Sequence, residues 1–592
     1  MKRRDFLKGI PAVVGANSLA GCALRDASIG TGRGHVLPSD PDWPSAREWD
    51  GLRSQLGGRL IQPISPFANC DAGAESCAEL VEQTTNSFYV GDHPALTQSS
   101  GWAGAWQSLP SAYAVVAEQA SDVAAAVNFA RTHRLRLVIK GGGHSYQGTS
   151  SAADSLLVWT RRMRSVELLD AFVALGCSDI QSPQSAVSMG AGAMWIDAYD
   201  AVTTKGGRFV QGGGCTTVGV AGLIQSGGFG SLSKRFGLAA GGLLQAEVVT
   251  ADGVVRVANE KHNPDLFWAL KGGGGGTFGV VTRVTLRTRE LPNSVGAVFG
   301  TVKARSDAAY RRLIVRVMTF YARELLNPHW GEQMTFKPDN TLRVGMMYSD
   351  LSVAEASALW ATFVDSIRSD TDYEVEKEFR FLDVPPQRLW DAGYLEKALP
   401  GSIVRDDRAG AQRHHFVWKG DQKQVGQFVH AYKSAWLPAS LLGGASRIEA
   451  LSHALYEASR HWDISLHFNK GLAGAREEEL AAARKCATNP VVVDAFALAI
   501  CGAEGPPAYA GMPGLRPNPG DAQRAAAATS KAMGALTRMI PNYGSYVSES
   551  DYFQNGWQRA FWGSNYERLV DVKQKYDPGN LFSVHHGVGS EY

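Results

Sequence analysis

Gly141-Gly142-Gly143-His144-Ser145-Tyr146 follows an apolar run and is the first of three glycine-rich stretches that decide the fold. The other two are Gly212-Gly213-Gly214-Cys215-Thr216-Thr217-Val218-Gly219-Val220, and Gly272 to Gly276 followed by Thr277-Phe278-Gly279. All three border segments that we predict to be strands. Glycine there lets backbone N–H groups approach a ligand closely and form concave anion sites, as a pyrophosphate or a flat ring system requires. None fits GxGxxG inside a βαβ unit or GxxxxGK[ST], so nicotinamide-type and P-loop sites are excluded.

The composition is that of a large globular protein. The chain has 592 residues, 44% of them apolar and 20% charged, which excludes a disordered or collagen-like chain and leaves room for several domains. Lys and Arg number 59 against 57 Asp and Glu, a formal charge of +2, so the chain lacks the basic field that nucleic-acid binding needs. The 65 glycines are about 11% of the chain, against a usual value of about 7%. The excess is concentrated in the three glycine-rich stretches.

Outward from the first stretch, the pattern predicts a β-α-β start. Tyr113 to Glu118 and Leu135 to Ile139 are apolar runs typical of strands, and Ser121 can cap a helix that runs through Ala130. A second helix is predicted from Met194 to Thr204. Further strands are predicted near Arg208 and at Glu247 to Thr250, Val254 to Val257 and Val280 to Leu286, so that a mixed domain ends near Arg289.

A second domain follows, with fewer glycine runs and many aromatic residues. Within Trp462 to Asn469, apolar residues alternate with Asp463, Ser465, His467 and Asn469, which predicts a strand with one polar face. That face points either at solvent or at a substrate, whose hydroxyls Asp463, His467 and Asn469 could hold. An Ala-rich helix is predicted from Asp521 to Met539, before Pro541.

The motifs taken together resemble the berberine-bridge-enzyme-like FAD-linked oxidases of the vanillyl-alcohol-oxidase superfamily. The resemblance runs through residues 86–290 and again through about 540–590, where Asn565-Tyr566-Glu567-Arg568-Leu569 and Lys575-Tyr576-Asp577-Pro578-Gly579-Asn580 are similar to the C-terminal signature. The segment between is matched more loosely, notably at His467-Phe468-Asn469-Lys470-Gly471-Leu472. The resemblance implies an α+β fold in which a two-part PCMH-type FAD-binding domain (86–290 and 541–592) is interrupted by an α/β substrate domain (291–540) with an antiparallel sheet.

The same resemblance implies a covalently bound FAD. His144 would bond to the flavin 8α-methyl carbon and Cys215 to ring carbon C6; imidazole and thiolate are both nucleophiles able to add to an electron-poor ring. Each residue alone could instead be structural, a loop histidine or a small buried cysteine. The expected cofactor-binding residues are His144, Cys215, Gly141, Gly142, Gly143, Ser145, Gly214, Val218, Gly219 and Gly279.

The catalytic residue expected from the resemblance is Tyr546, the base that takes a substrate proton. Gly544 to Glu549 is predicted to be a strand with Tyr546 and Ser548 on one face, similar to the family's Tyr-x-Asn motif. A phenol has an ordinary pKa of about 10, so it must be lowered by positive charge or hydrogen bonds for this task. The alternative is a packed core tyrosine.

Three positions depart from the family pattern and one agrees with it. Ser548 stands where Asn is usual, Leu223 where many members carry His, and Phe229 where some carry a second catalytic Tyr. Val218 matches the small residue that goes with access of oxygen to the flavin. We therefore expect an oxidase that transfers a hydride from an alcohol-bearing substrate, a sugar or an aromatic alcohol, to the flavin, with oxygen as acceptor. The alternatives are a dehydrogenase with another acceptor and a flavin-containing surface protein without turnover.

The first 22 residues read as an export signal. Arg3-Arg4 followed by Phe6-Leu7-Lys8 is similar to a twin-arginine signal, and Leu19-Ala20-Gly21-Cys22 resembles a lipobox; cleavage by an ordinary signal peptidase is the alternative. We expect a periplasmic, extracellular or lipid-anchored protein. In such a compartment Cys70 and Cys77, or Cys486 and Cys501, are close enough in sequence to form disulfides, or they stay unpaired. No Cys or His cluster has zinc spacing, so we expect no metal site.

Overall fold

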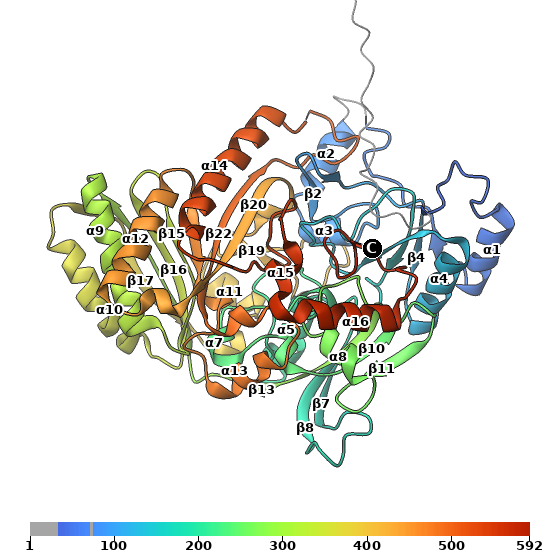
Figure 1. Ribbon diagram of the computed structural model, residues 1–592, viewed down its shortest axis with the longest axis horizontal. Coiled ribbons are helices and arrows are strands. Elements are labelled where there is room, and N and C mark those ends of the chain that lie inside the picture. The colour runs from blue at the N-terminus through green and yellow to red at the C-terminus, as the bar shows by residue number, and fades with distance from the viewer. Residues whose placement is uncertain (1–33, 71–74, 515, 592) are drawn as a thin grey trace, which may run out of the picture.

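The computed structural model describes residues 34–70, 75–514 and 516–591. The predicted export signal and Cys22 lie outside these residues. Figure 1 shows two neighbouring parts: early and C-terminal segments gather on one side, and a large sheet with its covering helices, from the middle of the chain, occupies the other. No helix within the described ranges is long and apolar enough to cross a membrane.

The first part contains a small, mainly parallel sheet in the order β1-β4-β6-β5. Its strands are β1 (Leu60–Ile61), β4 (Tyr113–Val116), β5 (Arg136–Lys140) and β6 (Ser155–Trp159), and helix α4 (Ala120–His133) links β4 to β5. The predicted β-α-β start is therefore confirmed, but β6 lies between its two strands. The helix cap differs from prediction: α4 begins after Gln119, and the Asp122 carboxylate accepts the N–H groups of Glu118 and Gln119 at 3.0 and 3.2 Å.

An antiparallel five-stranded sheet, in the order β11-β10-β12-β8-β7, completes this part. Its strands are β7 (Val166–Phe172), β8 (Gln184–Gly190), β10 (Leu243–Val249), β11 (Val255–Ala258) and β12 (Val280–Arg287). The predicted second helix is α5 (Trp195–Tyr199), which continues as a π-helix over Asp200–Lys205. Two short helices, α6 (Val220–Gln225) and α7 (Ser233–Phe236), follow the second glycine-rich stretch, and α8 (Pro264–Ala269) precedes the third.

The second part is built on a nine-stranded sheet in the order β17-β14-β16-β15-β21-β22-β20-β2-β3. Its strands are β14 (Val295–Ala304), β15 (Trp330–Phe336), β16 (Thr341–Ser349), β17 (Tyr373–Val384), β20 (Gly426–Pro438), β21 (Ile464–His467), β22 (Ala495–Gly505), β2 (Ser99–Trp102) and β3 (Trp106–Gln107). All pairs are antiparallel except β2 with β20. The antiparallel sheet expected in residues 291–540 is thus present, and β2 and β3 join it from residues that the sequence places in the first domain.

The two faces of this sheet have different neighbours. Four helices cover one face: α9 (Asp307–Phe320), α10 (Val353–Arg368), α12 (Ala445–Ser459) and α14 (Pro519–Thr537), which Figure 1 shows on the outer side. Side chains alternate along each strand, so Met334 and Phe336 pack in the helix-covered core while Gln333 and Thr335 line a cavity on the other side. The cavity therefore lies on the sheet face that no helix of this group covers.

The remaining elements connect or flank the two parts. They are α1 (Ala46–Gln55), α2 (Glu75–Gln83), α3 (Ser87–Gly91), α11 (Ala392–Ala398), α13 (Glu477–Arg484), α15 (Trp557–Trp562), α16 (Tyr566–Tyr576), and the pairs β9 (Arg208–Phe209) with β13 (Arg289–Glu290) and β18 (Ile403–Arg405) with β19 (Phe416–Trp418). The C-terminal helices return to the first part: Lys573 Nζ donates to Thr277 O at 2.9 Å, and Trp562 Nε1 donates to Gly272 O at 3.0 Å.

Of the two cysteine pairs that the sequence allowed to form disulfides, only one does. Cys70 and Cys77 form a disulfide, whereas Cys486 and Cys501 are free and buried. Cys486 and Cys501 belong to two different hydrophobic clusters, so their closeness in sequence does not bring them together.

Two strand predictions need correction. The strand predicted from Trp462 to Asn469 covers only Ile464–His467, because Phe468–Lys470 turns into a short 3-10 helix. The strand predicted from Gly544 to Glu549 is wrong. Ser545 N donates to Ala560 O and Tyr546 N to the Ser434 hydroxyl, while Glu549 N donates back to Tyr546 O, so these groups serve separate loop contacts instead of a ladder.

Candidate active site

One large cavity, with a volume of about 1400 Å³, lies between the two parts of the molecule. Its wall includes residues of all three glycine-rich stretches, of the uncovered face of the nine-stranded sheet, and of the C-terminal segment. Every cofactor-binding and catalytic residue predicted from the sequence lines it. These residues are Gly141, Gly142, Gly143, His144, Ser145, Gly214, Cys215, Val218, Gly219, Gly279 and Tyr546.

The first two glycine-rich stretches touch through their backbones. A Cβ atom on Gly142 would lie 2.7 Å from Gly219 N and 2.9 Å from Thr217 O, and one on Gly219 would lie 2.9 Å from Gly142 N. Any larger side chain at either position would push the stretches apart. Gly214 differs, since a Cβ there would have no atom within 4 Å. Glycine at 142 and 219 therefore permits close loop packing, while glycine at 214 keeps cavity space open.

His144 is held between these two stretches. Its Nε2 lies 3.0 Å from the Thr217 hydroxyl, which leaves Nδ1 as the nitrogen able to form another bond. Burial lowers the pKa of His144 to about 4, so the imidazole is neutral and nucleophilic near pH 7.

Cys215 is two residues before Thr217 and faces the same cavity. Burial, and then the neighbouring Asp421 carboxylate, raise the pKa of its thiol well above the ordinary value. Burial also raises the pKa of Asp421, to about 6. The thiol is therefore protonated at neutral pH, beside a carboxyl group that titrates close to neutrality. Asp421 carried no signal in the sequence.

The cavity wall has the polar groups and the size that a dinucleotide cofactor needs. Several buried side-chain atoms on the wall have no hydrogen-bond partner among the described residues: Ser87 Oγ, Gln98 Oε1, Gln147 Oε1, Ser150 Oγ, Gln225 Oε1, Thr277 Oγ1, Ser402 Oγ, Asn469 Oδ1 and His586 Nδ1. Buried polar atoms normally find a partner, so unpaired ones around one space fit a polar ligand. The volume exceeds the roughly 300–1,000 Å³ of ordinary small-ligand pockets, which leaves room for FAD and a substrate.

Comparison with known proteins agrees with this fit. Residues 110–259 match the FAD binding domain family and residues 545–589 match the berberine and berberine-like family. The VAO-type flavoprotein oxidase VAO615 of Thermothelomyces thermophilus is 30% identical over 97% of this chain and 97% of its own. The chain belongs to the VAO-type flavoprotein oxidases. It is an FAD-linked oxidoreductase.

Two solved structures share the fold. The crystal structure of VAO-type flavoprotein MtVAO615 from Myceliophthora thermophila C1 matches with a TM-score of 0.75 and 25% identity over 94% of this chain and 98% of its own. A glucooligosaccharide oxidase from Acremonium strictum, with a 6-S-cysteinyl, 8α-N1-histidyl FAD, matches with a TM-score of 0.60 and 20% identity over 81% of this chain and 91% of its own. The second likeness shows the fold alone.

In this VAO-type flavoprotein, Tyr546 is buried on the cavity wall. Its ring meets Phe229 edge-on, with centroids 5.1 Å apart, and lies 6.3 Å from Trp436. Burial, and then Glu549, raise the pKa of the phenol, while a hydrogen bond to Ser548 opposes this shift. The pKa of Tyr546 is therefore raised overall, whereas a phenol that acts as a base near neutral pH needs a lowered pKa. Leu223, Phe229 and Ser548, the three departures from the family pattern, all line the cavity.

Besides Asp421, two more functional groups of the wall were not predicted from the sequence. Lys470 Nζ lies 2.6 Å from both carboxylate oxygens of Glu549. Glu332, in β15, has a positive φ of 67° and a carboxyl pKa raised by burial. A glutamate in this backbone region is strained, and such strain concentrates at functional sites. Lys470 sits in the loosely matched His467–Leu472 motif, which could have pointed to it; Glu332 had no sequence signal.

The sequence left open whether the polar residues on and beside β21 face solvent or a substrate, and the structure shows both. His467 and Asn469 line the cavity, and Asn469 Nδ2 donates to Glu332 Oε1 at 3.4 Å. Asp463 is exposed at the start of the strand. Two of the three residues expected to hold substrate hydroxyls therefore face the cavity, and Asp463 faces solvent.

Proposed function

We propose that this flavoprotein oxidises a hydroxyl-bearing small molecule to a carbonyl compound and passes the two electrons to oxygen, forming hydrogen peroxide. The observation that carries the proposal is the common cavity, on whose wall His144, Cys215 and Tyr546 lie with unpaired polar atoms. FAD, when bound, supplies the redox chemistry by accepting a hydride and returning two electrons to oxygen.

We propose that FAD is attached through both His144 and Cys215. Support comes from the neutral imidazole, whose Nε2 is engaged by Thr217 so that Nδ1 is left for the bond. The glucooligosaccharide oxidase from Acremonium strictum, which shares the fold, carries FAD bonded to a cysteine and a histidine. The glycine residues, Ser145 and Val218 would hold the rest of the cofactor through backbone groups and close contact.

We propose Tyr546 as the group that removes the substrate hydroxyl proton. Its raised pKa makes it a poor base by itself, so its neighbours matter. The Ser548 hydroxyl can donate a hydrogen bond to the phenolate oxygen and so favour the charged form, and Lys470 pairs with the Glu549 charge that opposes it. Glu332 is a second candidate, because burial moves its carboxyl pKa upward, toward the value near pH 7 that suits a general base.

Oxygen is proposed as the acceptor because Val218, on the cavity wall, is small. Stopped-flow reoxidation of the reduced enzyme in air, with peroxide detection, tests this directly. Fast reoxidation with stoichiometric peroxide supports an oxidase. Slow reoxidation, with fast electron transfer to an artificial dye, would support the dehydrogenase alternative instead.

The substrate side of the cavity mixes aromatic and polar side chains. Phe299 is 51% exposed on β14, Trp418 and Tyr432 lie on the same wall, and Gln333 and Arg343 add polar groups. Such a wall suits a sugar that stacks on rings or an aromatic alcohol. We propose one of these two classes. A peroxide-coupled screen of oligosaccharides and of aromatic alcohols separates them, and no peroxide with either class would favour the non-catalytic alternative.

The domain boundaries and the location remain part of the proposal. Residues 86–290 and 541–592 would bind FAD, and residues 291–540 would bind substrate. The contacts of Lys573 and Trp562 with the third glycine-rich stretch support the first pairing. Export by the twin-arginine route, with or without a lipid on Cys22, is tested by fractionating cells that express the chain with Arg3→Lys and Arg4→Lys; retention in the cytoplasm is expected.

A further inference from the structure

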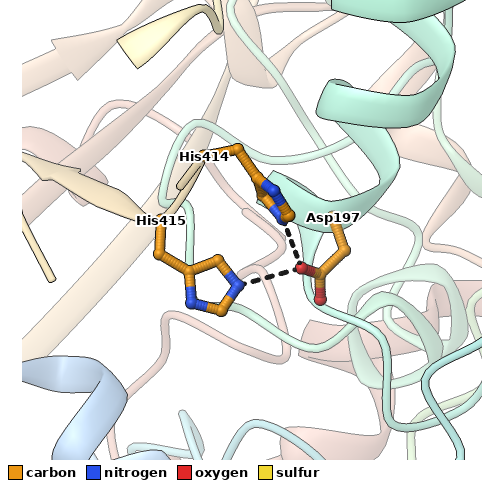
Figure 2. A group of neighbouring side chains, drawn as sticks. All are labelled: Asp197, His414 and His415. Carbon is orange, nitrogen blue, oxygen red and sulfur yellow. Dashed lines mark hydrogen bonds and ion pairs between the residues drawn. The ribbon is translucent and has the colours of Figure 1, made fainter. Parts of the chain in front are cut away.

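Asp197, His414 and His415 form a compact cluster outside the cavity wall. His414 Nε2 lies 3.0 Å and His415 Nε2 lies 3.1 Å from the same atom, Asp197 Oδ1, as Figure 2 shows. The three potential ligand atoms all lie within 4.8 Å of one another. Zinc binds His nitrogen and Asp oxygen at about 2.0–2.2 Å, so ligands around one tetrahedral ion are roughly 3.3–3.5 Å apart. The two nitrogen–oxygen separations of 3.0 and 3.1 Å need shifts of only a few tenths of an ångström to reach these values.

The second nitrogen of each histidine also faces a carboxylate. His414 Nδ1 lies 3.4 Å from Asp200 Oδ2, and His415 Nδ1 lies 3.9 Å from Asp406 Oδ2. The His414 contact approaches the arrangement found around metal-binding histidines, in which a carboxylate orients the ring and leaves the other nitrogen for the metal. The His415 contact is beyond hydrogen-bond distance. His415 is held further by stacking on Phe88, with ring centroids 4.5 Å apart.

The charges around the cluster leave room for a cation. Asp200 pairs with Lys205 at 2.6 Å and Asp406 pairs with Arg408 at 2.8 Å, so both outer carboxylates are already neutralised. Asp197 has no such basic partner among the described residues apart from the two histidines, and its other oxygen accepts the Met194 N–H at 3.1 Å. The side chains of His414 and Asp197 are 21% and 17% exposed, which gives an ion and a water ligand access.

We propose that Asp197, His414 and His415 bind a zinc ion. Two imidazoles and one carboxylate suit zinc or a similar transition metal, whereas calcium and magnesium prefer oxygen ligands only. None of the three residues lines the large cavity, so the role of the ion is structural rather than redox.

The ion would join two segments that build the cavity wall. Asp197 belongs to α5, whose Tyr199 donates its hydroxyl proton to Gly213 O at 2.6 Å, next to Gly214 and Cys215. His414 and His415 directly precede β19, whose Trp418 lies on the wall. A metal at this junction fixes the β18–β19 hairpin against the glycine-rich stretch that carries Cys215.

The test measures zinc in the purified holoenzyme. The protein is treated with a chelator, incubated with zinc sulfate, and passed over a chelating resin before elemental analysis. About one zinc per chain is expected for the wild type, and little zinc for His414→Ala or His415→Ala. The control is His453→Ala, which changes an exposed histidine on α12 and should also keep about one zinc per chain. Asp200→Asn, which removes the carboxylate charge beside His414 Nδ1 together with its ion pair to Lys205, should weaken zinc affinity by about 10–100-fold.

A wild-type measurement guards against variants that do not fold. X-ray absorption at the zinc edge should show two imidazole ligands, and zinc added after chelation should raise the midpoint of thermal unfolding of the wild type. Zinc near zero in the wild type, an absorption spectrum without imidazole scattering, or equal zinc in the wild type and both histidine variants would overturn the proposal. The last two results would mean an adventitious ion only. Zinc bound with FAD absent would leave the proposal standing while contradicting the proposed cofactor function.

Discussion

His144 Nε2 lies 3.0 Å from the hydroxyl of Thr217, so a side chain of the first glycine-rich stretch is fixed by the second, two residues after Cys215. The contact fixes the two proposed FAD attachment residues relative to each other. It also determines which imidazole nitrogen is left for the flavin, since Nε2 is engaged.

Thr217→Val should impair attachment through His144 without preventing folding. The change removes the hydroxyl but keeps the shape, at a cost of about 1 kcal/mol for one hydrogen bond. We expect a fraction of chains in which FAD is lost under denaturing conditions once Cys215 is also replaced by alanine. Intact mass spectrometry measures that fraction. Thr216→Val, a neighbouring buried threonine whose hydroxyl does not contact His144, is the control; equal attachment in both variants would contradict the role of the contact.

Gly142→Ala should destabilise the protein, because its Cβ would meet backbone atoms of Gly219 and Thr217. Overpacking of this kind costs about 1–3 kcal/mol. The matched change is Gly214→Ala, whose Cβ meets nothing within 4 Å and should leave stability unchanged while occupying cavity space. Denaturant unfolding compares the two. Equal stability of both variants would show that the stretches are not in close contact.

Lys234 gives a stability effect that depends on pH. The ammonium group is buried and donates to the carbonyl oxygens of Gly471, Ala473 and Phe496, and burial lowers its pKa to about 7. The unfolded chain holds this proton up to about pH 10.4, so between about pH 7 and 10 the unfolded state binds more protons and the contribution of Lys234 to stability rises with pH.

The free energy of unfolding of the wild type minus that of Lys234→Met should therefore increase from pH 7.0 to pH 9.5. Lys531→Met, at an exposed position of α14, should show no such change. Urea titrations at the two pH values give the difference. A constant difference would mean that the folded and unfolded states bind the same number of protons at Lys234.

Features that depend on neighbouring residues in the sequence could be predicted, whereas features that depend on residues far apart in the chain could not. The glycine-rich stretches, His144 and Cys215 could be recognised because their backbone requirements are local. The strand predicted around Tyr546 failed because its N–H bonds to Ser434, 112 residues away. The insertion of β6 between β4 and β5 was equally invisible, since strand order is set by packing. His414 and Asp197, 217 residues apart, have no common spacing signal, so a metal site was not expected.

Tyr546→Phe tests the proposed proton acceptor. Loss of general-base catalysis typically costs about 10²–10⁴ in rate, and we expect flavin reduction by a substrate found in the peroxide screen to slow within that range, with FAD still attached. Tyr432→Phe, which removes another, half-buried phenol hydroxyl of the same wall and keeps the ring, is the matched control and should have a much smaller effect. An unchanged rate in Tyr546→Phe together with a large loss in Glu332→Gln would transfer the role to Glu332.

The central claim is that His144 and Cys215 together hold FAD covalently. The most direct measurement denatures the purified protein in acid and records the visible spectrum and intact mass of the precipitated chain, for the wild type, His144→Ala, Cys215→Ala and the double variant. We predict yellow precipitate and the mass of one FAD in the wild type and in each single variant, and neither in the double variant. Colour that washes away from the wild type, or FAD that stays attached in the double variant, would contradict the account.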